Sequence, residues 1–280
     1  MKKEYLKSIA GLTLVEILIG IVVSSLMMAA MYSTYTIVNN SYNQVVDKAK
    51  ISRSSRDLVE LLIRDIRMSG FKYYLGTNEL GHNIDGTDPT VTKNNAGDLC
   101  CDKIHIVFDD FNQNDKLQPY KRYKLTYYAL PVSDSDDSNP RYAVYKSKIS
   151  WKQQRDSETA SWPTEGDWVS DCTECYHEQL VKDYVEDMEF IALDQEGRKL
   201  SPDPSPSDYS ARQNLYKIRS VDIRLAFRSE NEFFRFEARE GNERQLSGFS
   251  RAIKKYSDRY LRDSVVVTVY TRNIIDDGIF

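Results

Sequence analysis

The stretch Gly11-Leu12-Thr13-Leu14-Val15-Glu16 decides the fold of this 280-residue chain, because it joins a short basic leader to an apolar run from Leu12 to Met31. A helix of about 20 residues rises by roughly 30 Å, which is the thickness of the hydrocarbon core of a bilayer. The carboxylate of Glu16 lies inside this run. A charge there costs about 2.5–3.5 kcal/mol on insertion scales and usually serves a function. The run is therefore predicted to do more than anchor the chain.

The residues on either side of Gly11 resemble a known processing signal. The leader Met1–Gly11 is short, carries three lysines and ends in Gly, and it resembles the class III leader of prepilins. The following Leu-Thr-Leu-Val-Glu is similar to the start of type IV pilins and type II secretion pseudopilins. This resemblance implies that a prepilin peptidase cleaves between Gly11 and Leu12 and methylates the new amine of Leu12. Most members have Phe at that position, which tolerates other apolar residues.

The same resemblance gives Glu16 a role in assembly. An unpaired carboxylate is unfavourable in a membrane or a filament core, whereas the N-terminal amine of a neighbouring subunit attracts it strongly at low dielectric. The helix dipole also favours a negative charge near the start of the helix. Such a pair would fix the axial offset between subunits. The alternatives are an ordinary single-pass anchor with a stray Glu and a secretory signal, whose apolar core is usually shorter.

The helical pattern continues well beyond the apolar run. No Pro precedes Pro89, and the spacing predicts one helix from Leu12 to about Met68, with Gly70 as its C-terminal stop. Its second half is amphipathic, with apolar positions at spacings of three and four and charged positions between them. The apolar positions are Val45, Ala49, Leu58, Leu61, Leu62 and Ile66, and the charged positions are Arg53, Arg56, Glu60, Arg64 and Arg67.

Beyond Gly70 the periodicity changes to that of strands, rich in Tyr, Val, Ile and Phe. The predicted strands are Lys103–Phe108, Arg122–Leu130, Arg141–Ile149, Val185–Leu193, Ile218–Arg228, Phe233–Arg239 and Val265–Thr271. Polar stretches at Ser133–Pro140 and Ser201–Ser210 are predicted to be surface loops. The expected fold is α+β: a long N-terminal helix packs on an antiparallel β-sheet head. The expected divisions are a leader (1–11), a membrane-spanning assembly helix (12–34), an amphipathic continuation (35–70) and a β-rich periplasmic head (71–280).

Later segments resemble the PilW family of minor pilins, in the same order along the chain. They are Arg56–Phe71, Leu180-Val181 with Val185–Phe190, Ile218–Ser229 and Tyr260–Asn273. The resemblance covers nearly the whole chain, apart from the stretch between Phe71 and Asp98 and the region around Phe233–Ser250.

The net charge of −4 limits the partners that the chain attracts by charge alone. Loss of the leader removes a net charge of +2 (three Lys, one Glu), which leaves −4 − 2 = −6 for the mature chain. This argues against a general electrostatic grip on nucleic acid, although it leaves room for a local basic strip. Basic and aromatic residues mix in Arg235–Arg244 and Arg251–Tyr260, a pattern that suits single-stranded DNA. Acidic neighbours within both segments favour a solvated face instead.

Four cysteines occur as two close pairs, Cys100-Cys101 and Cys172-x-x-Cys175. An even number in an exported chain favours disulfides. We expect the bonds to join the two pairs, because a bond between adjacent cysteines is strained. The alternatives are a redox Cys-x-x-Cys motif and a zinc site that uses all four cysteines or His177, although adjacent cysteines fit structural zinc spacing poorly.

The segment that follows Phe108 places oxygen ligands at alternate positions, as calcium loops do. These residues are Asp110, Asn112, Asn114 and Asp115. No Gly follows at the sixth position, and Lys121 occupies the twelfth, where an EF-hand has Glu. A polar hairpin turn is therefore the preferred interpretation, with a weak calcium site as the alternative and no other cofactor expected. His82, His105 and His177 are scattered, and no nucleophile, zincin or phosphate-loop motif occurs, so no enzymatic activity is predicted.

Together, the resemblance implies a minor pilin that primes type IV pilus assembly and belongs to the complex at the tip. Its implied partners are other minor pilins, the major pilin, prepilin peptidase, the inner-membrane assembly platform and, before assembly, the lipid bilayer. It would first be a single-pass protein of the inner membrane with a periplasmic head, and then part of a pilus. The alternatives are a type II secretion pseudopilin of the J class, and a membrane-anchored adhesin or binding protein with an uncleaved anchor.

Overall fold

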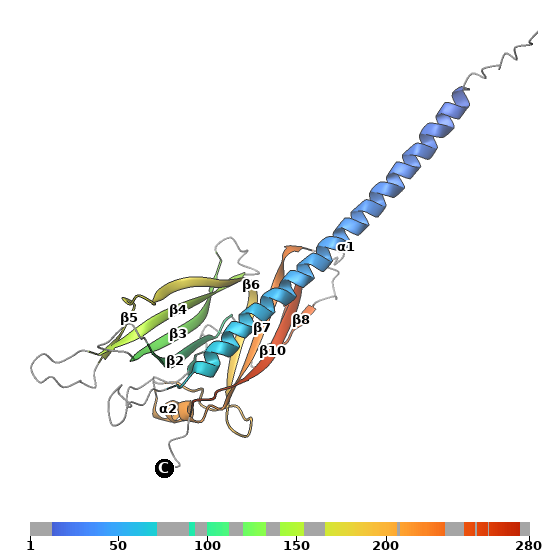
Figure 1. Cartoon of the computed structure of the whole chain (residues 1–280). Helices are drawn as coiled ribbons and strands as arrows, with labels where there is room; N and C mark the ends of the chain where they lie inside the picture. Colours follow the sequence, from blue (N-terminus) through green and yellow to red (C-terminus); the bar gives the residue numbers. More distant parts are fainter. Residues whose placement is uncertain are drawn as a thin grey trace, which may run out of the picture. The chain divides into compact units, whose positions relative to one another are not determined.

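The structure is a computed structural model that describes residues 13–71, 90–92, 100–111, 120–132, 141–153, 166–205, 208–232, 244–249, 251–256 and 258–274. The chain divides into two compact units, Met1–Asp47 and Lys48–Phe280. The described part of the first unit consists of helix and one residue before it. The second unit holds the end of that helix and all the strands (Figure 1).

The long helix α1 spans Leu14–Met68, so the predicted extent of the helix is confirmed to within two residues at its start. Gly70 follows it with φ +73°, a left-handed conformation that favours glycine, and the predicted stop is confirmed. A Cβ atom at this position would lie 2.8 Å from Cγ1 of Ile274. The Gly70 amide donates a hydrogen bond to the carbonyl of Val107 at 2.9 Å, which ties the helix exit to the sheet.

Most strands form one antiparallel sheet in the order β1-β2-β3-β4-β6-β7-β10, and β5 pairs with β4 (Figure 1). Strands β8 and β9 form a separate antiparallel pair. The bounds of the strands are β1 Thr90–Thr92, β2 Lys103–Phe111, β3 Tyr120–Pro131, β4 Tyr142–Gln153, β5 Gly166–Val169, β6 Tyr176–Leu193, β7 Ser220–Glu232, β8 Arg244–Leu246, β9 Lys254–Tyr256 and β10 Tyr260–Tyr270. A short helix, α2, spans Tyr209–Tyr216.

The core lies between the sheet and the part of α1 that belongs to the second unit. Leu58, Leu62 and Ile66 are almost completely buried there. They share one apolar cluster with alternate residues of the strands, such as Ile104 and Ile106 of β2. Because side chains alternate between the two faces of a strand, the residues between these core positions point to the opposite face. The expected α+β fold, with a long helix packed on an antiparallel sheet, is therefore confirmed.

Six of the seven predicted strands are confirmed, and most are longer than predicted. Phe233–Arg239 and the Ser133–Pro140 loop lie outside the described residues. Two apolar positions of the amphipathic pattern, Val45 and Ala49, have exposed side chains, whereas Leu58, Leu62 and Ile66 are buried. The short elements β1, β5, β8, β9 and α2 were not predicted, and α2 begins inside the loop that was expected at Ser201–Ser210.

Candidate assembly site

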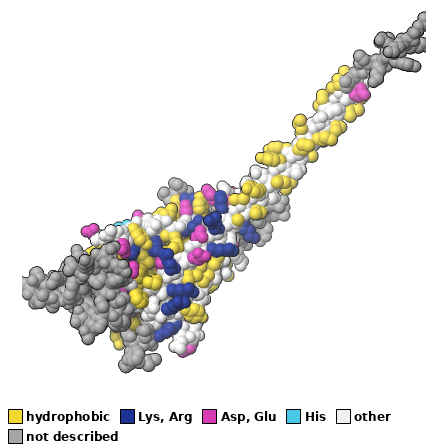
Figure 2. Space-filling model, viewed as in Figure 1, with side chains coloured by type: hydrophobic (Ala, Val, Ile, Leu, Met, Phe, Trp, Pro, Cys, Tyr) yellow, Lys and Arg dark blue, Asp and Glu magenta, His cyan; other side chains and the backbone are white. Residues whose placement is uncertain are grey.

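The first unit exposes an apolar surface. Its large apolar side chains between Leu14 and Val45 are exposed by 44% (Val23) to 77% (Leu14). Figure 2 shows them as yellow atoms along the helix. By length and composition, this is the one described helix that could cross a membrane. Contiguous apolar surface of this extent is unfavourable in water and is typical of an interaction site.

Glu16 forms a capping box with Thr13 at the start of α1. Its Oε2 accepts hydrogen bonds from the Thr13 amide and from the Thr13 hydroxyl, both at 3.0 Å. The Glu16 amide in turn lies 3.3 Å from the Thr13 hydroxyl oxygen. Within the described range 13–71, no donor contacts the other carboxylate oxygen, so the group retains acceptor capacity for a cation. The predicted cleavage site, Gly11 and Leu12, lies outside the described residues.

The second half of α1 carries a different carboxylate, Asp65, which is buried at 5% exposure. Its Oδ2 accepts hydrogen bonds from the Tyr127 hydroxyl at 2.5 Å and from Lys146 Nζ at 2.7 Å. Burial and the neighbouring Asp65 carboxylate raise the pKa of Tyr127 above its ordinary value. Asp65 therefore ties the helix to β3 and β4 through charge-assisted bonds. One signal in the sequence pointed to this residue and was overlooked: Asp65 occupies a position on the apolar stripe, three residues after Leu62.

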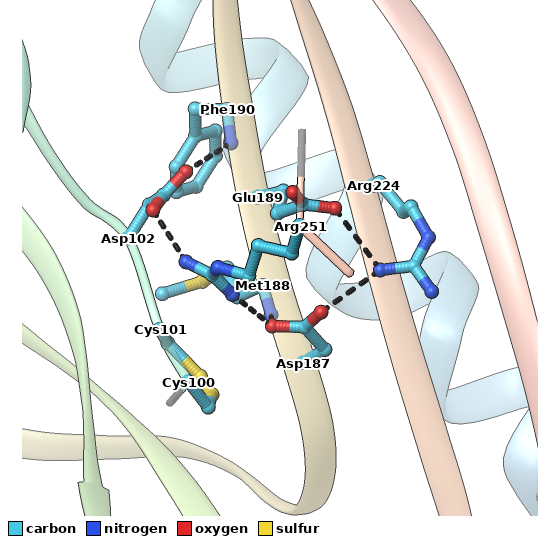
Figure 3. The surroundings of a disulfide bond; sticks show 9 residues. All are labelled: Cys100, Cys101, Asp102, Asp187, Met188, Glu189, Phe190, Arg224 and Arg251. Carbon is cyan, nitrogen blue, oxygen red and sulfur yellow. Dashed lines mark hydrogen bonds and ion pairs between the residues drawn. A yellow bond between two sulfur atoms is a disulfide. The ribbon is translucent and has the colours of Figure 1, made fainter. Parts of the chain in front are cut away.

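A buried network of ion pairs lies on the face of β6 and β7 that is opposite to the core residues Met188 and Phe190 (Figure 3). Arg224 Nη1 contacts Asp187 at 3.0 Å and Glu189 at 3.2 Å. Arg251 bridges Asp187 and Asp102. Asp102 also accepts a hydrogen bond from the Phe190 amide at 3.0 Å. The network connects the start of β2, β6, β7 and the segment between β8 and β9. It therefore fixes Arg251 to the face of the sheet that points away from the core.

The two cysteine pairs form disulfides within themselves, Cys100–Cys101 and Cys172–Cys175. The expectation that bonds join one pair to the other was therefore wrong. A tight turn explains the second bond, because the Cys175 amide donates to the Cys172 carbonyl at 3.0 Å and the Cα atoms lie 5.0 Å apart, within the disulfide range. The first pair precedes Asp102 and lies beside the ion-pair network (Figure 3). The zinc site that was weighed for all four cysteines does not fit this pairing.

One group of possible metal ligands occurs among the described residues, formed by Cys100, Cys101 and Asp187 with ligand atoms within 4.8 Å of one another. Both sulfur atoms belong to a disulfide, and two arginines bind the Asp187 carboxylate. These donors therefore do not fit a metal ion in this state. Of the candidate calcium ligands, Asp110 lies in β2, while Asn112, Asn114 and Asp115 lie outside the described residues.

His105 lies in β2, as the alternation of Ile104-His105-Ile106 predicted. Its Nδ1 lies 2.9 Å from the hydroxyl of Thr126 on β3. Burial lowers the pKa of His105 to about 4, and the positive charges of Lys124 and Lys103 add to this effect. The ring is therefore neutral at pH 7. The sequence indicated the strand position of His105 but not the two neighbouring cations.

No protein-family model and no curated protein matches the chain. Among solved structures, the chain is similar to the type IV-like pilin TTHA1219 from Thermus thermophilus, with 11% sequence identity and a TM-score of 0.42. The alignment covers 81% of this chain and 100% of that chain.

Proposed function

We propose that this chain is a pilin-type subunit, a minor pilin that helps to start a type IV pilus. The observation that carries the proposal is the first half of α1, where exposed apolar side chains surround a helix that begins with Thr13 and Glu16. The residues that precede this helix resemble a prepilin leader. Together they support a subunit that is held in a membrane by the helix and later transferred into a bundle of like helices.

Glu16 is the residue that directs docking in this proposal. After cleavage between Gly11 and Leu12, each subunit would have a new N-terminal amine close to its own Thr13. The Glu16 carboxylate of one subunit would pair with the amine of the next, since opposite charges attract strongly where water is excluded. The capping box holds this carboxylate at the helix start until the neighbouring amine arrives. The head would supply the contacts to other minor pilins at the tip.

The test is N-terminal mass spectrometry of the protein from membranes and from sheared filaments, in cells with and without prepilin peptidase. A peptide that begins at methylated Leu12, and that disappears without the peptidase, supports the proposal. A peptide that retains the leader residues in cells with active peptidase contradicts it, and the chain would then be an ordinary membrane-anchored protein.

A further inference from the structure

The face of the sheet that points away from α1 carries a group of aromatic rings and lysines on β2 to β5. Ile104 and Ile106 point into the core, so Lys103 and His105 point to the opposite face. Tyr128 of β3 and Tyr145 of β4 are opposite each other in the strand register and stack with ring centroids 6.0 Å apart. The ammonium group of Lys103 lies 5.9 Å from the centroid of the Tyr128 ring.

A second pair of rings lies on the same face, further along the strands. Trp151 of β4 is opposite Trp168 of β5, and their rings meet edge to face at 5.2 Å. Lys124 of β3 places its ammonium group 4.4 Å above the Trp168 ring. All four rings are partly exposed. The face therefore offers two aromatic platforms, each with a lysine beside it.

Lys103 and Lys124 supply positive charge beside the aromatic rings of this face. Neither Lys103 nor Lys124 forms an ion pair within the part of the chain that the structure describes. Asp109 is already bound to Arg122, at 2.6 Å and 3.0 Å. Burial is the main cause of the low pKa of His105, and the positive charges of Lys124 and Lys103 lower it further. At the edge of the face, Glu178 of β6 helps to raise the pKa of Tyr128, after the larger effect of burial.

We propose that this aromatic and basic face binds single-stranded nucleic acid. Bases stack on aromatic rings regardless of sequence, and lysines contact the phosphates between them. A small sheet that presents aromatic side chains can stack two or three bases in this way. The same face also carries the His105 ring, whose Nδ1 lies 2.9 Å from the Thr126 hydroxyl, and Ser147, which is opposite Thr126 in the strand register. This inference does not depend on the pilin proposal.

The test is fluorescence anisotropy with the full chain in a neutral detergent and a labelled 15-nucleotide oligo(dT), at 50 and 200 mM salt. We expect binding that weakens with salt. The double variant Lys103→Gln/Lys124→Gln should weaken binding at least about tenfold. It should also reduce the slope of log affinity against log salt concentration by about 1.4, because each phosphate that a lysine no longer neutralises contributes about 0.7. Tyr128→Leu and Trp168→Leu should each weaken binding by roughly 5- to 100-fold, as expected when one base no longer stacks.

Two variants serve as matched controls, Lys217→Gln at the end of α2 and Tyr209→Leu within it, because both side chains are exposed and lie outside this face. Both should bind within about twofold of the parent chain. Quenching of tryptophan fluorescence by oligo(dT) in the unmodified chain tests stacking without any variant. Absence of oligo(dT) binding at 50 mM salt, or tryptophan fluorescence that oligo(dT) does not quench, overturns the proposal. Equal losses of affinity in the two control variants also overturn it. So does tighter binding of heparin than of oligo(dT), if Tyr128→Leu leaves the affinity for oligo(dT) unchanged.

Discussion

The two halves of α1 use the same backbone but have opposite surroundings. Residues 14–45 expose their large apolar side chains, and Glu16 near their start contacts its own Thr13. Residues 48–68 bury Leu58, Leu62 and Ile66 against the sheet, and Asp65, one of their carboxylates, contacts a tyrosine and a lysine of the head. Residues of the sheet in the same chain cover the buried side chains of the second half. The first half leaves its large apolar side chains exposed.

The largest effect on the head is expected from Asp65→Asn. The substitution leaves the buried ammonium group of Lys146 without its carboxylate, and loss of one member of a buried pair typically costs about 3–5 kcal/mol. The free energy of unfolding of the head, measured by denaturant titration in detergent, should fall by that amount. The control Asp57→Asn changes an exposed carboxylate on the same helix, so it should change the free energy by less than about 0.5 kcal/mol. Equal effects of the two variants would contradict the role of Asp65.

A matched pair of leucines measures the difference between the halves directly. Leu62 is 0% exposed, whereas Leu18 is 57% exposed. Leu62→Ala should lower the free energy of unfolding of the head by about 2–5 kcal/mol, because it leaves a cavity in the core. Leu18→Ala should leave that free energy unchanged. If Leu18→Ala destabilised the head as strongly, the first half of α1 would have a partner within the chain.

The helix, its glycine stop and six strands could be predicted from the sequence because each depends on local pattern. The 3.6-residue period predicted α1, the need for a left-handed residue singled out Gly70, and alternation placed His105 on a strand. The disulfide pairing could not be predicted, since it depends on the turn between Cys172 and Cys175. The contacts of Asp65 also escaped prediction, because Tyr127 and Lys146 are more than 60 residues away and only the folded sheet brings them to the helix.

His105 should make the stability of the head depend on pH. Its folded-state pKa is lowered from 6.5 to about 4, so the unfolded state binds a proton first as the pH falls. The contribution to stability is fully present above pH 6.5 and is lost between pH 6.5 and 4, by about 3 kcal/mol at most. His105→Gln should remove this part of the pH dependence, as measured by denaturant titrations from pH 4 to 8. If the free energies of unfolding of the parent chain and of His105→Gln changed with pH in the same way, the contribution assigned to His105 would be contradicted.

The smallest effect is expected from Thr13→Ala, which removes the capping hydroxyl. Loss of an N-cap side chain typically costs about 0.5–2 kcal/mol of local helix stability. The amide of Ile17, which donates to the Thr13 carbonyl at 3.3 Å, should exchange its hydrogen faster in detergent micelles, while amides beyond residue 48 keep their rates. Unchanged exchange at Ile17 would show that the cap does not hold the helix start.

The most direct test of the central claim compares Glu16→Gln with Asp57→Asn in cells that supply all other subunits. The measurement is the fraction of each variant in sheared filaments, relative to its amount in the membrane. If Glu16 pairs with a neighbouring amine, Glu16→Gln should enter filaments at least about tenfold less than the parent chain, because the amine keeps its charge without a partner. Asp57→Asn should enter normally. Normal entry of Glu16→Gln would contradict the claim that the exposed half of α1 is completed by other subunits through this carboxylate.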